Sequence, residues 1–403
     1  MDDWRTFDIA NPTEEHAMIR EMVRDFVREE VEPQALEHDR EEKFNLDLFR
    51  KLGEYGLLGI TISDEYGGAG MDATAAAIVN EELSYSDPGF CLAYLAHAQL
   101  TVNNLAINGS DEQKARFLPG LCSGDLVGCM AMSEPDYGTD ALGMTTSATL
   151  QEDGNWCING RKMWITNGVI DDVGTPADIV WLYARTGTDA RGRPEISTFI
   201  VERGMPGYKS GQKIMDKLGM RASNTAELVF EDCIVPSSNL VGETGNSIQH
   251  MMRNLEIERV ALAAQAVGIS RRCLAAMSRY AGEREAFGKP IREFGQMQRH
   301  IGESWAEYRA MRAYVYETCR VMDLETGGQR LDSDGVKLFA TTAAKNIADR
   351  AIQVMGGYGY VGEYVVERLW RDSKLLEIGG GTLESHQKNI TRDLAKNPEP
   401  IEE

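Results

Sequence analysis

The chain has 403 residues, with 42 Lys and Arg against 63 Asp and Glu, and therefore a formal net charge of −21. Its 42% of hydrophobic residues can form a large core, which excludes a disordered chain, a collagen-like chain and a small disulfide scaffold. An acidic chain repels phosphate backbones, so no nucleic-acid partner is expected. At about 150 residues per domain, the length predicts two or three domains.

The first part of the chain, from residue 13 to about 127, follows a helical pattern. Apolar residues recur at spacings of three and four in residues 18–27. Asn11-Pro12-Thr13, followed by two glutamates, predicts a helix that begins near Thr13 with acidic side chains in its first turn. We therefore expect an N-terminal helical domain over residues 1–127.

The hydrophobic period changes to two between about residues 128 and 240. Runs rich in β-branched and aromatic residues occur at 179–183, 197–201 and 227–230, and Gly, Asn and Asp turn signals separate such runs. This pattern predicts an antiparallel, barrel-like β-domain over residues 128–240.

From residue 241 onward the helical pattern returns, in long segments at about 246–282, 290–325 and 333–355. We expect a helical domain over residues 241–403. The order helical, β, helical differs from the alternating strands and helices of a nucleotide-binding Rossmann sheet. Residues 357–362 match GxGxxG, but a helical segment precedes them, so they indicate a turn that ends a helix rather than a nicotinamide site.

The N-terminus and the cysteines bear on the compartment. The first sixteen residues carry five acids and one arginine, which is not typical of a signal or transit peptide. No run of ~18 apolar residues predicts a membrane span. Seven scattered cysteines without CxxC, and six dispersed histidines, predict reduced thiols and no metal site. A cytoplasmic location is the expectation.

Two segments at the start of the β region suit a polar, ring-shaped ligand. Residues 131–140, AMSEPDYGTD, combine small hydroxyls and a glycine in an irregular loop. In residues 162–168, KMWITNG, Trp164 and Thr166 lie two apart and therefore on one face of a strand. A flat aromatic ring beside a hydroxyl fits a heteroaromatic ligand. The alternatives are an ordinary interdomain loop and a half-buried tryptophan.

Six segments together resemble signature sequences of the acyl-CoA dehydrogenase family, in the family's order and spacing: AMSEPDYGTD, KMWITNG, KLGMRASNTAELVFEDCIVP, REAFGKPI, QVMGGYGYVGEY and RDSKLLEIGGGT. Within the family, YLAHAQL, NLEIERV and EIGGGT most resemble the isovaleryl type. The resemblance implies a helical domain, a β-domain and a C-terminal four-helix bundle. It also implies non-covalent FAD, an acyl-CoA substrate, a homotetramer, and electron-transfer flavoprotein as the oxidant.

The resemblance further implies which residues contact FAD. The flavin ring would lie against a loop and a strand, at Met130, Met132, Ser133, Gly138, Thr139, Trp164, Ile165 and Thr166. The pyrophosphate and adenosine would be held across a subunit interface by Arg284, Phe287, Gln353, Gly356 and Gly357, with Thr382 as a further contact. The family usually has a Gln eleven residues after this Arg. Here Gly295 stands in that place, and the adjacent Gln296 is the residue that would substitute for it.

Oxidation of a thioester at Cα–Cβ requires a base for the α-proton, and a desolvated carboxylate suits this role because burial raises its pKa. Many family members carry this Glu in the motif at 377–382, where the corresponding residue here is Gly380. Isovaleryl-type and long-chain members place it on a helix before an Arg, which here is Glu258 before Arg259. We predict Glu258 as the base, the alternative being a simple ion pair with an Arg. Glu256, on the opposite helix face, is the expected solvated acid.

The same resemblance outlines the substrate site. The backbone N–H of Gly380 and a flavin ribityl hydroxyl would bind the thioester oxygen, and Arg259 would meet the CoA portion. The acyl pocket would be lined by Leu92, Tyr94, Ala96, Thr139 and Gly379. The missing side chains at 379 and 380 favour a branched or cyclic acyl group. Cys91 occupies the place of the arginine that holds the distal carboxylate in glutaryl-type members, and His97 is expected to be a buried, satisfied histidine.

Several alternatives stay open at this point. An oxidase of the same superfamily would pass electrons to O₂, but such oxidases typically carry an additional C-terminal helical domain. A thioester-binding protein without a base and a nicotinamide dehydrogenase are the rivals from other classes. A bulky or carboxylated acyl group, of the aryl or succinyl type, is the alternative substrate, and the sequence does not indicate the physiological direction.

Overall fold

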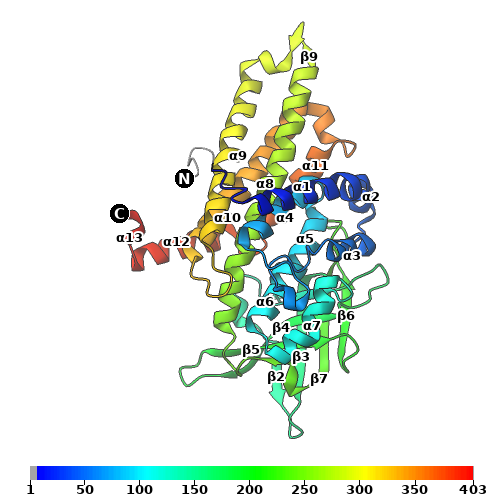
Figure 1. Ribbon diagram of the computed structural model, residues 1–403, viewed down its shortest axis with the longest axis vertical. Coiled ribbons are helices and arrows are strands. Elements are labelled where there is room, and N and C mark those ends of the chain that lie inside the picture. The colour runs from blue at the N-terminus through cyan, green and yellow to red at the C-terminus, as the bar shows by residue number, and fades with distance from the viewer. Residues whose placement is uncertain (1–6, 403) are drawn as a thin grey trace.

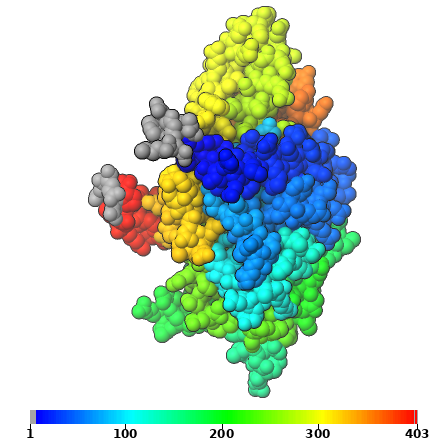
Figure 2. Space-filling model, in the orientation of Figure 1, coloured from blue at the N-terminus to red at the C-terminus, as the bar shows by residue number. Residues whose placement is uncertain are grey.

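The computed structural model describes residues 7–402, which form a β-domain and two helical regions along the longest axis of the molecule (Figure 1). Figure 2 shows the N-terminal helices, in blue, as a band between the β-domain and the tip of the C-terminal helices. The helix–β–helix order is the predicted one. The changes between regions fall at residues 123–128 and 241–248.

The N-terminal region consists of short helices: α1 (Glu14–Phe26), α2 (Glu32–Glu41), α3 (Leu46–Glu54), α4 (Ala73–Ser86), α5 (Pro88–His97), α6 (Asn103–Asn108) and α7 (Asp111–Ser123). The predicted helix start is confirmed, because the Thr13 side chain accepts the His16 N–H and caps α1. Single π-helical turns join α1 to α2 (Val27–Val31) and α5 to α6 (Ala98–Val102). Helix α5 is buried along its whole length, between this region and the C-terminal helices.

The middle region is a single sheet in the order β6-β7-β3-β2-β4-β5-β8, with β1 beside β4. Its strands are β1 (Gly128–Ala131), β2 (Ser147–Leu150), β3 (Trp156–Thr166), β4 (Ile179–Thr188), β5 (Pro194–Glu202), β6 (Tyr208–Lys213), β7 (Thr225–Val235) and β8 (Leu240–Val241). Most neighbouring pairs are antiparallel, whereas β4 runs parallel to β1 and β2. The β3–β7 register shifts between Lys162 and Ile165, and this bulge re-aims the side chain of Trp164.

The C-terminal region is a bundle of α8 (Ile248–Glu283), α9 (Gly295–Val321), α10 (Arg330–Met355) and α11 (Val365–Leu376), followed by α12 (Leu383–Lys396) and α13 (Glu399–Glu402). Strands β9 (Glu285–Ala286) and β10 (Lys289–Pro290) form the tip at the top of Figure 1. Helix α9 begins later than the sequence predicts, because this hairpin and a 3₁₀ turn (Ile291–Glu293) precede it. By length and composition α8 could cross a membrane, but 78% of its apolar window is buried inside the molecule, as in the core helix of a bundle.

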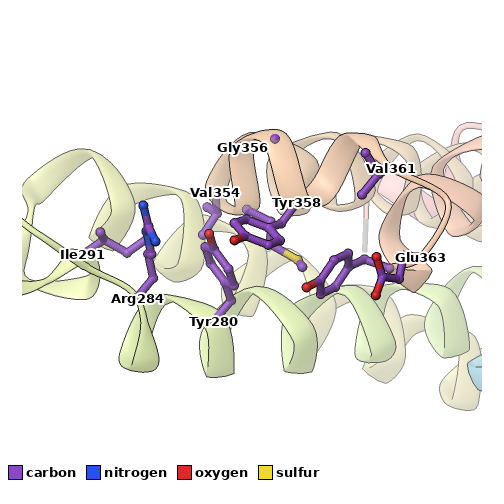
Figure 3. Close-up of a pocket in the computed structure, with 11 residues that line it drawn as sticks. Tyr280, Arg284, Ile291, Val354, Gly356, Tyr358, Val361 and Glu363 are labelled. Atoms are coloured by element: carbon purple, nitrogen blue, oxygen red, sulfur yellow. The ribbon is translucent and has the colours of Figure 1, made fainter.

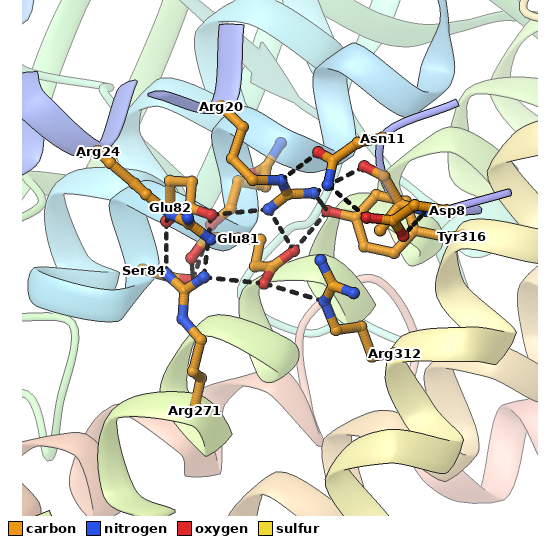
Figure 4. A network of polar contacts seen from close by, with 12 residues as sticks. Asp8, Asn11, Arg20, Arg24, Glu81, Glu82, Ser84, Arg271, Arg312 and Tyr316 are labelled. Carbon is orange, nitrogen blue, oxygen red and sulfur yellow. Dashed lines mark hydrogen bonds and ion pairs between the residues drawn. The ribbon is translucent and has the colours of Figure 1, made fainter. Parts of the chain in front are cut away.

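Four helices meet at a buried group of charges, which we call the Glu81 cluster: Arg20 on α1, Glu81 and Glu82 on α4, Arg271 on α8, and Arg312 and Tyr316 on α9 (Figure 4). Arg20 Nη1 lies 2.9 Å from Glu81 Oε2 and 2.7 Å from Glu82 Oε1. Burial alone would raise the pKa of Glu81, but Arg20, Arg271 and Arg312 together lower it to about 2. The cluster therefore holds its carboxylates ionised and links the two helical regions.

Candidate active site

The loop after α11 brings Gly380 against α8. Gly380 has a φ of +65°, a conformation that favours glycine. A Cβ at this position would lie 2.6 Å from Leu262 Cδ1 and 3.3 Å from Cδ of Glu258. The space of a side chain at 380 is thus filled by Leu262 and by the Glu258 carboxyl group. The two positions considered for the base, 258 and 380, converge on one point in space.

The Glu258 carboxyl group is buried and incompletely hydrogen-bonded. Its residue is 9% exposed, and Oε2 has no hydrogen-bond partner among residues 7–402. Burial raises the pKa of Glu258 above its ordinary value, and the charges of Lys337 and Arg259 offset only part of that rise. A desolvated carboxylate with a free acceptor atom is a stronger base than a solvated one.

The two charged neighbours of Glu258 on α8 are placed differently from the expectation. Glu256 is not a solvated acid: it is 7% exposed, and its Oε2 accepts the N–H groups of Gly328 at 2.9 Å and Gln329 at 3.0 Å. That prediction is wrong because the loop between α9 and α10 covers this face of α8. Arg259 is 6% exposed, and its Nη1 lies 3.2 Å from Oδ1 of Asp334. Its contact with CoA stays a prediction, and inside the protein its guanidinium pairs with Asp334.

The predicted acyl-pocket residues of α5 face two ways. Leu92 and Ala96 belong to the same core as Leu262 on α8, and their place in an acyl pocket stays a prediction. Tyr94 instead packs into the separate core of the N-terminal helices, because it lies on another face of α5. At Gly379 a Cβ would meet only Leu375, at 3.6 Å or more, so this position leaves room. At 380 the space is filled, so the expected enlargement of the acyl pocket is limited to 379, where it stays a prediction.

His97 has the expected structural role. It is fully buried, Nε2 lies 2.9 Å from the Leu121 carbonyl oxygen, and Nδ1 accepts the Gly128 N–H at 2.9 Å. Both ring nitrogens are satisfied, and burial lowers the pKa of His97 to about 4. His97 is therefore a neutral core residue rather than a polar contact for substrate.

A buried lysine fixes the loop at 131–140 against β3. Lys162 is fully buried, and its Nζ donates to the Met132 carbonyl and to Glu134 Oε1, both at 2.9 Å. The Met163 N–H donates to the Ser133 carbonyl at 2.9 Å. Burial lowers the pKa of Lys162 to about 8 despite the opposing charge of Glu134. These contacts bring Met132 and Ser133 beside the strand that carries Trp164.

Strand β3 presents an aromatic surface at its bulge. Trp164 is 60% exposed and has a φ of +67°, a strained conformation of the kind that clusters at functional sites. Thr166, on the same face of β3, is partly exposed, whereas Ile165 is 3% exposed and packs inside the sheet. Gly138 and Thr139 lie in the exposed part of the neighbouring loop. An exposed ring beside small hydroxyls fits an isoalloxazine, and Ile165 could contribute only its backbone.

A cavity of about 540 Å³ lies between the end of α8 and the turn after α10 (Figure 3). Arg284, Gly356 and Gly357 line it, together with Tyr280, Tyr358 and Tyr364. A Cβ at Gly356 or Gly357 would meet nothing within 4 Å, so a ligand can approach this backbone closely. A cation, an open backbone and aromatic rings fit a pyrophosphate joined to a heteroaromatic base.

The remaining predicted FAD residues lie apart from this cavity. Phe287, at the tip of the β9–β10 hairpin, is 95% exposed, and Gln296 and Gln353 are exposed on α9 and α10. Thr382 caps α12, because its side chain accepts the Ser385 N–H. The structure does not bring these four residues together within one chain, and their roles stay predictions.

Three buried polar residues near Gly380 were missed in the sequence: Asp334, Lys337 and His386, all fully buried. A signal for Lys337 existed. It lies in the buried stripe Ser333, Val336, Ala340 and Ala344 of α10, where a charge requires a partner. Lys162 gave a similar signal, because the period of two in β3 turns it inward. The partners themselves come from other helices and strands and cannot be read from spacing.

Comparisons with known proteins agree with this geometry. Three family models match consecutively: the acyl-CoA dehydrogenase N-terminal domain at residues 13–125, the middle domain at 129–233 and the C-terminal domain at 248–395. The chain belongs to the acyl-CoA dehydrogenase family. It is an acyl-CoA dehydrogenase, and this family consists of FAD-dependent oxidoreductases of CoA thioesters.

Individual relatives match over nearly the whole chain. The mitochondrial isovaleryl-CoA dehydrogenase of Oryza sativa subsp. japonica is 41% identical over 380 residues, which cover 94% of this chain and 90% of the relative. Butyryl-CoA dehydrogenase from Megasphaera elsdenii has a TM-score of 0.90 and 32% identity, covering 98% of this chain and 100% of that chain. An acyl-CoA dehydrogenase from Bacillus anthracis, solved in complex with FAD, has a TM-score of 0.87 and 31% identity, covering 96% and 68%.

One structural relative corrects the argument from length. A prolyl acyl carrier protein oxidase has a TM-score of 0.88 and 29% identity to this acyl-CoA dehydrogenase, covering 95% of this chain and 99% of the oxidase. An oxidase of this fold therefore does not require an additional domain, and the length of the chain does not separate the two activities.

Proposed function

We propose that this acyl-CoA dehydrogenase oxidises a branched acyl-CoA to its α,β-enoyl-CoA, with Glu258 as the base that removes the α-proton. The observation that carries the proposal is the convergence of Glu258 and Gly380: the carboxyl carbon of Glu258 lies 3.3 Å from where a Cβ at 380 would be. This chain fills that point from α8, and there is no room for a second carboxylate.

The residues around this point have separable tasks. Oε2 of Glu258, which no described residue hydrogen-bonds, is free to accept the α-proton. The backbone N–H of Gly380 would donate to the thioester oxygen and stabilise the charge that develops there. Leu262 lies beside the Glu258 carboxyl group, and the burial of Glu258 keeps water away from it, which strengthens the carboxylate as a base.

FAD, when bound, supplies the acceptor for the hydride that leaves Cβ. Trp164, Thr166 and the 131–140 loop would hold its ring system, and Arg284 with Gly356 and Gly357 would hold its phosphates. The support is the exposed, strained Trp164 and the open, cationic cavity, together with the FAD complex of the Bacillus anthracis relative. A homotetramer, electron-transfer flavoprotein as the oxidant and a cytoplasmic location belong to the same proposal.

The branched substrate rests on the pocket wall and on the relatives. The isovaleryl-CoA dehydrogenases match this chain at about 40% identity. The wall formed by Leu92 and Ala96 is apolar, Gly379 leaves room beside it, and the fully buried Cys91 offers no cation for a distal carboxylate. We therefore favour isovaleryl-CoA over carboxylated thioesters.

A panel of acyl-CoA thioesters tests this proposal. The holoenzyme is mixed anaerobically with isovaleryl-, 2-methylbutanoyl-, butyryl-, glutaryl- and cyclohexanecarbonyl-CoA, and the loss of flavin absorbance is followed. Branched thioesters should bleach the flavin fastest. Bleaching by butyryl- or glutaryl-CoA alone would contradict the pocket argument.

An oxidase is the second candidate, because the oxidase relative has the same fold and length. The test follows directly from the panel: the reduced enzyme is exposed to air, and reoxidation of the flavin is timed. We expect slow reoxidation by air and fast reoxidation by an artificial electron acceptor. Fast reoxidation by air would favour the oxidase.

A further inference from the structure

A second group of buried charges lies directly behind the Gly380 loop. We call it the Asp334 cluster: Arg259 on α8, Asp334 and Lys337 on α10, and His386 on α12. All four residues are at most 6% exposed. None of them takes part in the proton abstraction described above, yet two of them hydrogen-bond the backbone of the residue that follows Gly380.

Both contacts to that backbone are made to one oxygen. Lys337 Nζ donates to the Gly381 carbonyl at 2.6 Å, and His386 Nε2 lies 2.9 Å from the same carbonyl oxygen. A carbonyl only accepts hydrogen bonds, so Nε2 carries the hydrogen in this contact. Two donors from two helices thereby hold the Gly381–Thr382 peptide, in the loop where the N–H of Gly380 is the expected donor to the thioester.

The other nitrogen of His386 contacts Asp334. Its Nδ1 lies 2.5 Å from Asp334 Oδ1. Arg259 Nη1 contacts the same Oδ1 at 3.2 Å. Asp334 therefore links the imidazole of His386 on α12 to the guanidinium of Arg259 on α8.

Lys337 is the cation of this cluster that bears most on Glu258. The charged and titratable groups around it are Glu258 and Arg259 on α8, Asp334, Glu377 at the end of α11, and His386. Lys337 Nζ is held at the Gly381 carbonyl, and the Cβ position of the neighbouring Gly380 lies 3.3 Å from Cδ of Glu258. Burial raises the pKa of Glu258, and the charge of Lys337, ahead of that of Arg259, opposes this rise. The ammonium group thus serves two partners, the loop carbonyl and the base.

We propose that Lys337, His386 and Asp334 are positioning residues of this active site: they fix the Gly380–Gly381 loop, and Lys337 keeps Glu258 ionised beside it. The proposal rests on the proposed role of Glu258 as the base. It separates two tasks. The charge task, keeping Glu258 ionised, belongs to Lys337, and the geometric task, fixing the Gly380–Gly381 loop, belongs to His386 and Asp334.

The charge task is tested by the pH dependence of kcat/KM for isovaleryl-CoA, or for the thioester that the panel shows to be oxidised fastest. In Lys337→Met the acidic limb should move to higher pH by about one unit, because the carboxylate loses a nearby positive charge. Lys337→Arg keeps the charge and should restore the limb. Asp334→Asn should leave the limb in place, because Asp334 is not among the groups that shift the pKa of Glu258. An unmoved limb in Lys337→Met would overturn the charge task.

Lys217→Met is the matched control. Lys217 is a partly buried lysine that donates to backbone carbonyls, those of Met220 at 2.8 Å and Ser223 at 2.6 Å, and burial likewise lowers its pKa, to about 8. Its loss should cost stability without moving the acidic limb. A similar limb shift in both variants would show a general effect of losing a buried lysine and would overturn the proposal.

The geometric task is tested by the division between kcat and KM. His386→Leu removes one donor to the Gly381 carbonyl and should lower kcat about tenfold while KM changes less than about twofold, because a donor needed in the transition state is misplaced. His386→Gln, whose amide can still donate to that carbonyl, should recover part of the loss. A kcat of His386→Leu within twofold of the wild type would overturn this task.

The same series separates failure of this proposal from failure of the proposed function. Glu258→Gln is measured in parallel. If it retains turnover, the base is assigned wrongly and the proposed mechanism fails. If it is inactive while the limb of Lys337→Met and the kcat of His386→Leu equal those of the wild type, only the positioning proposal fails.

Discussion

The protein buries carboxylates in two places and treats them in opposite ways. In the Glu81 cluster, Glu81 is surrounded by Arg20, Arg271 and Arg312, and its pKa falls to about 2. At Glu258, fewer cations face the carboxyl group, one oxygen has no partner among the described residues, and the pKa rises. Both sites involve α8. Arg271 of this helix helps to neutralise the carboxylates of the Glu81 cluster, whereas Glu258 of the same helix has too few neighbouring cations to offset its burial.

The comparison shows that neighbouring cations decide whether a buried carboxyl group stabilises the fold or acts as a base. Burial raises the pKa of both carboxyl groups, and the number and closeness of the cations decide the outcome. Surplus cations make a carboxylate a weak base and a strong link between helices. A deficit leaves a basic carboxylate that costs stability and can take a proton from a weak carbon acid.

The largest expected effect concerns Glu258, the buried carboxylate with few neighbouring cations. Glu258→Gln should keep the fold and FAD binding but lose about 10³-fold or more in turnover, because the amide cannot accept the α-proton. Steady-state oxidation of isovaleryl-CoA with an artificial electron acceptor measures it. Glu256→Gln is the matched control on the same helix. It should lose stability through the Gly328 and Gln329 contacts and retain most turnover, and equal losses in both variants would contradict the assignment.

The next largest effect concerns the Glu81 cluster. Arg20→Met removes one cation from a pair whose side chains are at most 4% exposed, which should destabilise the protein by about 3–5 kcal/mol. Thermal unfolding of the holoenzyme measures the loss. The kcat of the folded fraction should be unchanged, because the cluster supports helices and does no chemistry. A large loss of kcat without a fall in Tm would contradict the view that the Glu81 cluster stabilises the fold and takes no part in catalysis.

A smaller effect tests the crowding at residue 380. Gly380→Ala places a Cβ 2.6 Å from Leu262 Cδ1 at a φ of +65°, so it should cost roughly 1–3 kcal/mol and push the Glu258 carboxyl group aside. Gly379→Ala is the neighbouring control, where the nearest atom would be 3.6 Å away. It should fold normally and only narrow the choice of acyl group. Equal Tm values of the two variants would argue against the claim that Glu258 and Leu262 occupy the space of a side chain at position 380.

The smallest effect is a gain in stability. The raised pKa of Glu258 means that the folded state binds this proton more tightly than the unfolded state, so stability falls as the pH rises through that range. Glu258→Gln should therefore raise Tm by ~2 °C at pH 8.5, where Lys337, with its pKa lowered to about 7, is uncharged. The gain should shrink as the pH falls and vanish at about pH 3, where the carboxyl group is protonated in both states. A Tm of Glu258→Gln below that of the wild type at pH 8.5 would contradict the claim that too few cations offset the burial of the Glu258 carboxylate.

The sequence predicted what depends on periodicity and local signals. The three regions, the cap at Thr13 and the helical context of residues 357–362 follow from hydrophobic spacing and turn chemistry. Glu258 came from the resemblance to isovaleryl-type family members, and its role as the base stays a prediction. Glu256 was misplaced because a helix wheel shows faces of one helix, not the loop that covers them. Tyr94 was grouped with Leu92 through the resemblance, although residues two apart lie on different faces of a helix. The Asp334 cluster joins three helices, and no spacing reveals such a meeting.

The most direct test of the central claim measures proton removal alone. 3,3-Dimethylbutanoyl-CoA has α-hydrogens but no β-hydrogen, so it offers the base a proton and cannot be oxidised at Cα–Cβ. In ²H₂O, NMR should show the wild-type holoenzyme exchanging these α-hydrogens for deuterium, and Glu258→Gln should show no exchange above the enzyme-free rate. Exchange by Glu258→Gln at the wild-type rate would show that another group removes the proton.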